Sequence, residues 1–270
     1  MSSTQVQPGR SENKLLAAER RTRIAELVDR KRSVSVAELK DMFGISAVTV
    51  RSDLMALEEE GRLKRMYGGA ISINLARQVP VPKKRAEMHS QEKRVVASRA
   101  AQFVSDGDCI AIDTGSTTLE LVRQLVVKRD LTIVTNDLTI AEFVEDSIPS
   151  ADLMLLGGAF RRGHRYTYGQ LSHACLDLIH MDAVFLATNS YQPGQGFMTE
   201  YEPVATVKSD MIAHSDKSYV LMDSSKVGSK SFIRFAKLSD VDVLVMDGDP
   251  DGTMAGEIAS LGAKTHLVIV

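Results

Sequence analysis

The sequence contains no apolar run of the roughly 20 residues needed to cross a bilayer. Its apolar runs, such as those within residues 151–156 and 266–270, are far shorter. The first residues, MSSTQVQPGRSENK, are polar and lack the apolar core of a secretory signal peptide. The two cysteines, Cys109 and Cys175, belong to no CxxC pair, which argues against a disulfide framework. These absences predict a cytoplasmic protein with no membrane partner.

The phosphate-binding signatures of nucleotide enzymes are also missing. The chain has neither the Gly-Lys-Ser/Thr of a Walker loop nor the GxGxxG of a dinucleotide fold, so we expect no nucleotide cofactor. Five of the histidines, at positions 89, 173, 180, 214 and 266, lack the spacing of metal ligands, so we expect no metal. The remaining composition, 44% hydrophobic and 25% charged, is typical of a globular protein with a sizeable core.

Charge is distributed unevenly along the chain. Residues 1–85 hold 17 Lys and Arg against 10 Asp and Glu, whereas residues 86–270 hold 16 against 25. A basic N-terminal piece on an acidic remainder indicates a polyanion-binding module attached to a second domain. Chance asymmetry would look the same, so charge alone does not decide between the two.

Three short helices are predicted in the basic piece. The first spans residues 19–32. The second begins at the capping residue Ser35 and stops at Gly44, and the third begins at Ser46 and ends at Gly61. A basic hairpin, RLKRMYGGA, follows the third helix. Together these features predict a winged helix-turn-helix domain over residues 19–70.

The third helix of such a domain enters the major groove of double-stranded DNA, and the hairpin lies on the backbone or in the minor groove. The predicted DNA-binding residues are Ser46, Ala47, Thr49, Arg51 and Ser52 on the helix and Arg62, Lys64 and Arg65 on the hairpin. We expect Asp53 to orient Arg51 or to cap a neighbouring element, because phosphate repels a carboxylate. The alternative is a three-helix packing module whose charges are only a solvated surface.

We expect a disordered tail over residues 1–18 and a linker over residues 71–88, where prolines and a basic run accompany a loss of periodicity. From residue 89 to 270, short apolar strands alternate with amphipathic helices. This alternation predicts an α/β domain with a mostly parallel sheet that helices cover on both faces. The predicted strands are residues 109–113, 131–136, 152–158, 183–188, 218–223, 242–248 and 265–270.

A binding site is predicted at the carboxyl ends of these strands, where open parallel sheets hold their ligands. A phosphate cup is expected at the start of the helix after the first strand, formed by Gly115, Ser116, Thr117 and Thr118. Further candidates lie at or just after the ends of this strand and of others: Asp113, Asn136, Gly157, Gly158 and Asn189. Each has a structural alternative, which is a helix N-cap for Asp113 and a turn cap for Asn136.

Two basic side chains complete the candidate site. Lys226 suits a phosphate or a sugar oxygen, although it also fits an ordinary surface lysine. Arg161 belongs to the basic loop 161–165, which either covers an anionic ligand or faces solvent or DNA.

The chain resembles the DeoR-type bacterial transcription regulators. The resemblance in the DNA-binding part rests on VSVAEL, FGIS, TVRSDL and YGGA, which lie between residues 34 and 70. It continues through DTGSTT, TND, LLGG and DSSKVG in the order the family uses. One departure is Ser52, where the family usually has a second arginine in the recognition helix.

The resemblance implies a C-terminal domain similar to sugar-phosphate isomerases, in which a phosphorylated sugar or related metabolite sets DNA affinity. Asp113 would then accept hydrogen bonds from sugar hydroxyls. Many family members carry a glutamate four residues before the position of Lys208, whereas this chain has Val204 there. Either this departure changes which sugar binds, or Glu202 occupies the same space.

The resemblance further implies a repressor of a carbohydrate-metabolism operon that acts as a homo-oligomer, a dimer or a tetramer, on operator DNA. An isomerase-like enzyme with an accessory DNA-binding domain is the second interpretation, and a scaffold that binds DNA without an effector is the third. No complete acid–base set can be identified, so the sequence favours a sensor with no catalytic residues.

Overall fold

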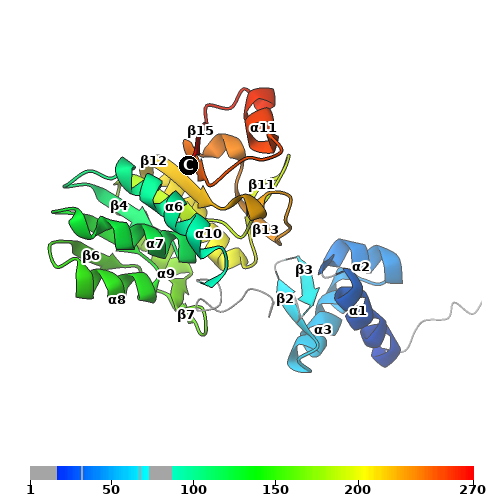
Figure 1. Cartoon of the computed structure of the whole chain (residues 1–270). Helices are drawn as coiled ribbons and strands as arrows, with labels where there is room; N and C mark the ends of the chain where they lie inside the picture. The colour runs from blue at the N-terminus through cyan, green and yellow to red at the C-terminus, as the bar shows by residue number, and fades with distance from the viewer. Residues whose placement is uncertain (1–16, 32, 67, 73–86) are drawn as a thin grey trace, which may run out of the picture. The chain divides into compact units, whose positions relative to one another are not determined.

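The computed structural model describes residues 17–31, 33–66, 68–72 and 87–270. It divides into two compact units, Met1–Val79 and Pro80–Val270, which are described separately (Figure 1). Most of the expected tail and linker lies outside the described residues. Within them, the first helix begins at Ala17 and the hairpin continues through Ser72, so structured elements extend two residues into each of those segments.

The N-terminal unit holds the three predicted helices, which are α1 (Ala17–Lys31), α2 (Val36–Phe43) and α3 (Ala47–Glu59). Ser35 caps α2 by accepting a hydrogen bond from the Glu38 backbone N–H at 3.1 Å. Gly44 ends that helix in the left-handed conformation, with φ 62°, which favours glycine. Local sequence signals therefore set the turn between the second and third helices.

The wing is a hairpin of β2 (Leu63–Met66) and β3 (Gly69–Ser72). A short strand that the sequence did not predict, β1 (Ser33–Ser35), pairs with β3 and completes a three-stranded antiparallel sheet. Only three residues pair, and they directly precede the α2 helix, so no alternation of apolar residues reveals them. Apolar residues of the three helices and the sheet form one core, with Ile24, Leu39 and Leu57 fully buried.

The C-terminal unit is built on a seven-stranded, wholly parallel sheet in the order β15-β14-β12-β9-β4-β5-β6. Its strands are β4 (Cys109–Ile112), β5 (Thr132–Thr135), β6 (Asp152–Leu155), β9 (Met181–Ala187), β12 (Ser215–Met222), β14 (Val243–Met246) and β15 (His266–Ile269). Each lies within or overlaps a predicted strand, because each carries a short apolar run; the central strands are buried, whereas all four residues of β6 are exposed.

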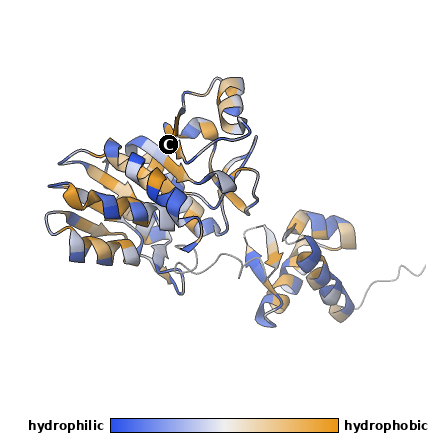
Figure 2. Ribbon diagram, in the orientation of Figure 1, coloured by the Kyte–Doolittle hydropathy of each residue, from blue (hydrophilic) through white to orange (hydrophobic). Residues whose placement is uncertain are grey.

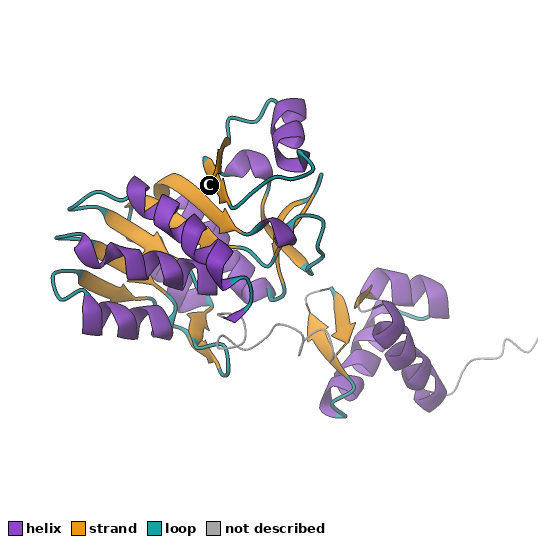
Figure 3. Cartoon of the chain, viewed as in Figure 1, coloured by secondary structure: helices purple, strands orange, loops and turns teal. Residues whose placement is uncertain are grey.

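Helices cover both faces of this sheet (Figure 3). One face packs against α6 (Ser90–Ala100), α7 (Ser116–Gln124) and α8 (Leu138–Ser147), and the other against α9 (Gln170–Leu176), α10 (Glu202–Ala213) and α11 (Thr253–Leu261). Short 3-10 turns extend α6 and α7 over Ala101–Phe103 and Leu125–Val127. Figure 2 shows hydrophilic and hydrophobic residues mixed along α7 and α8, as expected for helices that bury one face.

The sequence analysis did not predict several small elements of the C-terminal unit. They are α11, the antiparallel hairpin of β7 (Ala159–Arg161) and β8 (Tyr166–Tyr168), and the antiparallel sheet of β10 (Ser190–Gln192), β11 (Gly196–Thr199) and β13 (Ile233–Ala236). Further 3-10 turns span Ser224–Lys226 and Leu238–Asp240. Strands of three or four residues are too short for a reliable periodic signal.

Gly115 lets the loop after β4 approach β9 closely. A Cβ atom placed on Gly115 would lie 2.5 Å from the Ala187 Cβ and 3.0 Å from the Thr118 Oγ1. Atoms that close clash, so a larger residue would push the loop away from the sheet.

We expect Gly115→Ala to lower the free energy of unfolding by about 1–3 kcal/mol, the usual cost of overpacking. Gly157→Ala is the matched control, because a Cβ there meets nothing within 4 Å. Chemical denaturation followed by circular dichroism measures both. Equal stability of the two variants would contradict the close approach.

Candidate functional sites

The exposed face of α3 carries the predicted DNA contacts together with two apolar residues. Arg51 and Ser52 are exposed, as a DNA-contacting surface requires. Val48 and Met55, which the sequence analysis did not select, lie three or four residues from them and are 74% and 47% exposed. Their spacing places all four on one helix face, where apolar side chains suit thymine methyl groups.

Ser46 and Thr49 have structural roles at the start of α3. The Ser46 Oγ accepts a hydrogen bond from the Thr49 backbone N–H at 3.1 Å, and the two hydroxyl oxygens lie 2.8 Å apart. Ala47 between them is half-buried. Ser46 remains exposed, so it can cap the helix and still meet a phosphate.

Asp53 does not orient Arg51, contrary to one of the two expectations for it. Its carboxylate is 2% exposed and accepts hydrogen bonds from Arg20 at 2.6 and 3.2 Å and from Arg21 at 3.1 Å. Both arginines belong to α1, and their bonds tie the recognition helix to that helix. No local pattern reveals this contact, because the partners are 32 and 33 residues apart in the sequence.

The wing holds its basic side chains on the surface. Arg62, Lys64 and Arg65 are all exposed. Lys64 lies 3.0 Å and Arg65 3.7 Å from the carboxylate of Glu58 on α3, which also accepts the Arg65 backbone N–H. Exposed pairs of this kind are weak, so a DNA phosphate can replace Glu58 at little cost.

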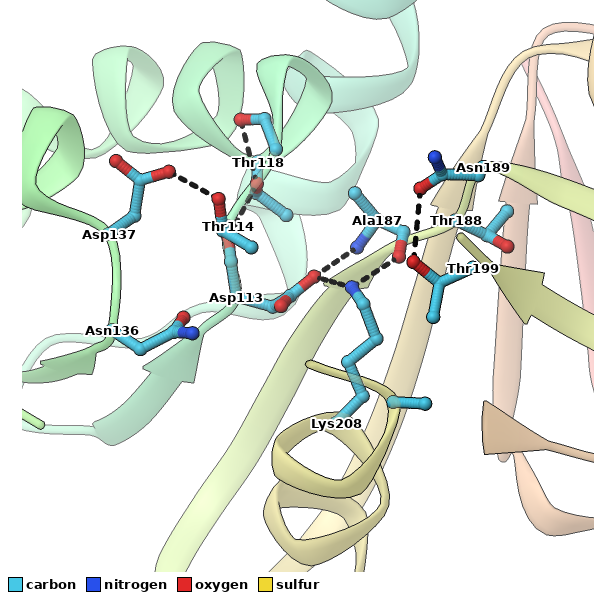
Figure 4. Close-up of polar contacts among 12 residues, drawn as sticks. Asp113, Thr114, Thr118, Asn136, Asp137, Ala187, Thr188, Asn189, Thr199 and Lys208 are labelled. Carbon is cyan, nitrogen blue, oxygen red and sulfur yellow. Dashed lines mark hydrogen bonds and ion pairs between the residues drawn. The ribbon is translucent and has the colours of Figure 1, made fainter. Parts of the chain in front are cut away.

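The carboxyl edge of the parallel sheet brings together most of the predicted effector residues. Asp113, Asn136 and Asn189 follow β4, β5 and β9, which are neighbours or next neighbours in the sheet. Gly157 and Gly158 follow β6 one strand further along, and both are exposed. Figure 4 shows Asp113, Thr114 and Asn136 at adjacent strand ends, with Lys208 extending from α10 toward Asp113.

A buried ion pair between Asp113 and Lys208 lies at the centre of this edge. The Lys208 ammonium donates to the Asp113 Oδ2 and, at 2.9 Å, to the Ala187 backbone oxygen. The Ala187 N–H donates to the same carboxylate at 3.2 Å. Burial raises the pKa of Asp113, and the Lys208 charge opposes that shift.

The N-cap alternative for Asp113 is therefore wrong, since Gly115 stands at the N-cap of α7 without a side-chain cap. Sequence reasoning did not select Lys208 as a site residue, because it lies 95 positions from Asp113 in the middle of a helix. Its only local signal is a lysine on an otherwise apolar helix face, where Val204, Val207 and Met211 are also buried.

Next to one another at this edge, on the residues that follow β4 and β5, two oxygen atoms are buried with no hydrogen-bond partner among the described residues. They are the Asp113 Oδ1 and the Asn136 Oδ1, and both side chains are 0% exposed. Buried acceptors of this kind are costly unless something donates to them. Hydroxyl groups of a bound molecule are suitable donors.

The hydroxyl groups of the loop after β4 differ in exposure and in the hydrogen bonds they already make. Thr118 is buried and donates to the Asp113 backbone oxygen at 2.7 Å, so it holds the loop. Thr114 donates at 2.5 Å to Asp137, a carboxylate that caps α8 and was not among the predicted residues. Ser116, the first residue of α7, is half-exposed, and Thr117 is 6% exposed. Ser116 and the α7 N-terminus thus remain the best placed for an anion.

Asn136 and Arg161 connect the β7–β8 hairpin to this edge. The Asn136 amide donates to the Thr167 backbone oxygen at 2.9 Å, which is not the turn cap proposed for it. The Arg161 guanidinium donates to the Tyr166 hydroxyl and lies 4.2 Å from the centre of the Tyr201 ring, at the start of α10. Hydrogen bonds and a cation–π contact thus link the hairpin to β5 and α10.

The side chains of the remaining predicted residues make long polar contacts, of 3.4 Å or more. Lys226 lies 3.8 Å from the buried Asp223, so it is neither a plain surface lysine nor a close ion pair. The Asn189 Oδ1 accepts from Thr199 at 3.4 Å. Glu202 begins α10, and its carboxylate accepts from the Thr206 hydroxyl at 3.4 Å, while Val204 is 2% exposed.

We expect Lys208→Met to lower the free energy of unfolding by about 3–5 kcal/mol, because it leaves a buried carboxylate without its cation. The paired change Asp113→Asn with Lys208→Met removes both charges and should recover part of that loss. Denaturant unfolding of the two single variants and the pair gives the coupling energy. Strictly additive losses would show that the two groups do not interact.

Within the described ranges, no group of three or more His, Cys, Asp or Glu side chains is placed to hold a metal ion. The same residues include no helix that is long and apolar enough to span a bilayer.

Comparison with known proteins places both units in one family. Residues 20–75 match the model of the DeoR-like helix-turn-helix domain, and residues 88–248 match that of the DeoR C-terminal sensor domain. The HTH-type transcriptional regulator GlpR of Haloferax volcanii is 33% identical over 250 residues, which cover 92% of this chain and 96% of that protein. The lactose phosphotransferase system repressor of Staphylococcus aureus is 31% identical over 233 residues, covering 85% and 91%.

Solved structures are more distant. A ribose-5-phosphate isomerase in complex with phospho-erythronic acid has 16% identity and a TM-score of 0.39 over 51% of this chain and 54% of its own. The eIF2B beta subunit of Chaetomium thermophilum has 12% identity and a TM-score of 0.44 over 90% and 69%.

The two family models together cover the recognition helix, the wing and the carboxyl edge of the parallel sheet. The matched relatives are named as regulators and repressors rather than enzymes. The chain therefore belongs to the DeoR family of transcription regulators, with an N-terminal helix-turn-helix domain and a C-terminal sensor domain.

Proposed function

We propose that this regulator represses a carbohydrate-metabolism operon in the cytoplasm, and that a phosphorylated sugar bound at the carboxyl edge of its sensor domain controls its DNA affinity. The observation that carries the proposal is the pair of buried, unpartnered oxygens on Asp113 and Asn136 beside the N-terminus of α7. One end of that site suits an anion, and the other suits hydroxyl groups.

The anion end consists of the first turn of α7. The first N–H groups of a helix have no partner within it, and the helix dipole makes this end positive. Ser116 adds a half-exposed hydroxyl there. We assign the phosphate to this end, with Gly115 and Thr118 holding the loop against β9 rather than contacting the phosphate.

The hydroxyl end is the cluster of Asp113, Asn136 and Lys208. The Asp113 Oδ1 and the Asn136 Oδ1 can each accept a hydrogen bond from a ligand, whereas the Asp113 Oδ2 and the Ala187 oxygen already accept from the Lys208 ammonium. A polyol that donates to both free oxygens would remove their desolvation cost. We propose that Arg161, Asn189, Glu202 and Lys226 set which sugar fits.

Repression of a sugar operon is supported by the names of relatives. The Staphylococcus aureus relative is named a repressor of the lactose phosphotransferase system. A repressor responds to its effector when the effector prefers one of two conformations that differ in DNA affinity. We propose a homodimer as the minimal unit, since two recognition helices then read two half-sites of an operator.

The DNA half of the proposal predicts that Arg51→Ala weakens specific operator binding by roughly 5- to 150-fold, the loss of one bidentate base contact. Fluorescence anisotropy with DNA from upstream of the chain's own gene measures this. Arg129→Ala, which removes an exposed arginine from the sensor unit, is the charge-matched control and should bind as the parent does. Equal losses in the two variants would show only a general charge effect.

The sensor half predicts that Ser116→Glu abolishes binding of phosphorylated sugars while the protein stays folded, because a fixed carboxylate would occupy the anion end. Ser90→Glu places the same charge at the first residue of α6 and should leave binding unchanged. Calorimetric titration with a panel of aldose and ketose phosphates compares the two. If a sugar phosphate binds Ser116→Glu as tightly as the parent, the phosphate lies elsewhere.

A further inference from the structure

We infer that β6 is the edge through which two copies of this chain pair, antiparallel and about a two-fold axis at Met154. The inference deepens the proposed homodimer by naming its interface. It would join two seven-stranded sheets into one continuous sheet.

The outer edge of the parallel sheet at β6 is unusually exposed and apolar. All four residues of β6 are exposed, with Leu153, Met154 and Leu155 at 37%, 38% and 45%. Leu156 then turns inward and is fully buried, and residues 157–160 are exposed again, with Phe160 at 46%. Contiguous apolar surface of this kind on a folded domain marks an interaction site.

The strand also lacks the features that keep edge strands apart. β6 reads Asp-Leu-Met-Leu, with no lysine, proline or bulge, and such edges attract another strand. The opposite edge, β15, is less uniformly exposed: it begins with the exposed His266 soon after Lys264, its Leu267 is half-buried and its Val268 is 7% exposed, and only Ile269 among its apolar residues is well exposed, at 48%. The contrast favours β6 over β15 as the pairing edge.

The backbone of β6 is self-complementary. The N–H groups of Asp152 and Leu156 both donate inward to β5 and its preceding residue, at 2.8 Å. Because N–H direction alternates along a strand, the N–H and C=O groups of Leu153 and Leu155 point outward. In an antiparallel pair centred on Met154, Leu153 of one copy exchanges two hydrogen bonds with Leu155 of the other. The two-fold axis generates the same pair of hydrogen bonds between Leu155 of the first copy and Leu153 of the second.

Charge at the two ends of β6 selects the same orientation. The end where β6 begins carries exposed Glu145, Asp146 and Asp152. The other end leads into the β7–β8 hairpin, with Arg161 and the exposed Arg162. Antiparallel pairing places the acidic end of each copy beside the basic end of its partner, whereas parallel pairing would place like charges together.

A cysteine at the two-fold axis tests the geometry directly. Residues opposite each other in a non-hydrogen-bonded pair have Cα atoms about 4.5 Å apart, within disulfide reach. Met154→Cys in the full chain should form a disulfide-linked dimer under mild oxidation, seen on a non-reducing gel. Ile269→Cys, on β15, and the parent with its native Cys109 and Cys175 are the controls and should remain unlinked.

Sedimentation of the full chain without DNA provides the second readout. Leu153→Lys with Leu155→Lys should raise the dimer dissociation constant at least roughly tenfold, since like charges would lie directly opposite. Ile269→Lys should leave it unchanged. Linking through Ile269→Cys, or an intact dimer with both lysines present, would overturn this interface while leaving the proposed function standing. A monomeric parent would overturn both the interface and the proposed dimer.

Discussion

The buried contact between Lys208 and Asp113 joins three elements of the sensor domain at one point. Asp113 follows β4, the Ala187 backbone belongs to β9, and Lys208 comes from the middle of α10. A buried charge needs both a counter-charge and further hydrogen bonds, and here each ion has them. The positions of α10 and of the loop after β4 therefore depend on each other, which is the arrangement that a ligand-responsive site requires.

The residues around this ion pair hold neighbouring elements close to it. Gly115 and Thr118 hold the loop close to the sheet, so the N-terminus of α7 lies beside the ion pair. Asn136 binds the β7–β8 hairpin, whose Arg161 lies over Tyr201 at the start of the same α10. A molecule that bound the Asp113 and Asn136 oxygens would thus contact elements linked to the start and to the middle of α10. In the DNA-binding unit, Asp53 plays the comparable part by fixing α3 against α1.

Much of this architecture could be predicted from the sequence, because its signals are local. Ser35, Gly44 and Ser46 set the helix boundaries, and the apolar strands reveal the parallel sheet. The long-range pairs could not be predicted: the partners of Asp53 and Asp113 lie 32 to 95 positions away. The packing constraint on Gly115 could not be predicted for the same reason, since it comes from the Ala187 side chain of another strand. Short strands such as β1 carry too few residues for any pattern.

The central claim is that a phosphorylated sugar at the carboxyl edge of the sensor sheet changes the affinity of the chain for DNA. The most direct measurement is the affinity for its own upstream DNA while a panel of phosphorylated sugars and their unphosphorylated counterparts is titrated in. We predict that at least one phosphorylated sugar shifts that affinity by roughly tenfold or more, within the usual range of allosteric coupling, and that its unphosphorylated counterpart does not. An affinity that no member of the panel changes, or that both forms change equally, would contradict the account.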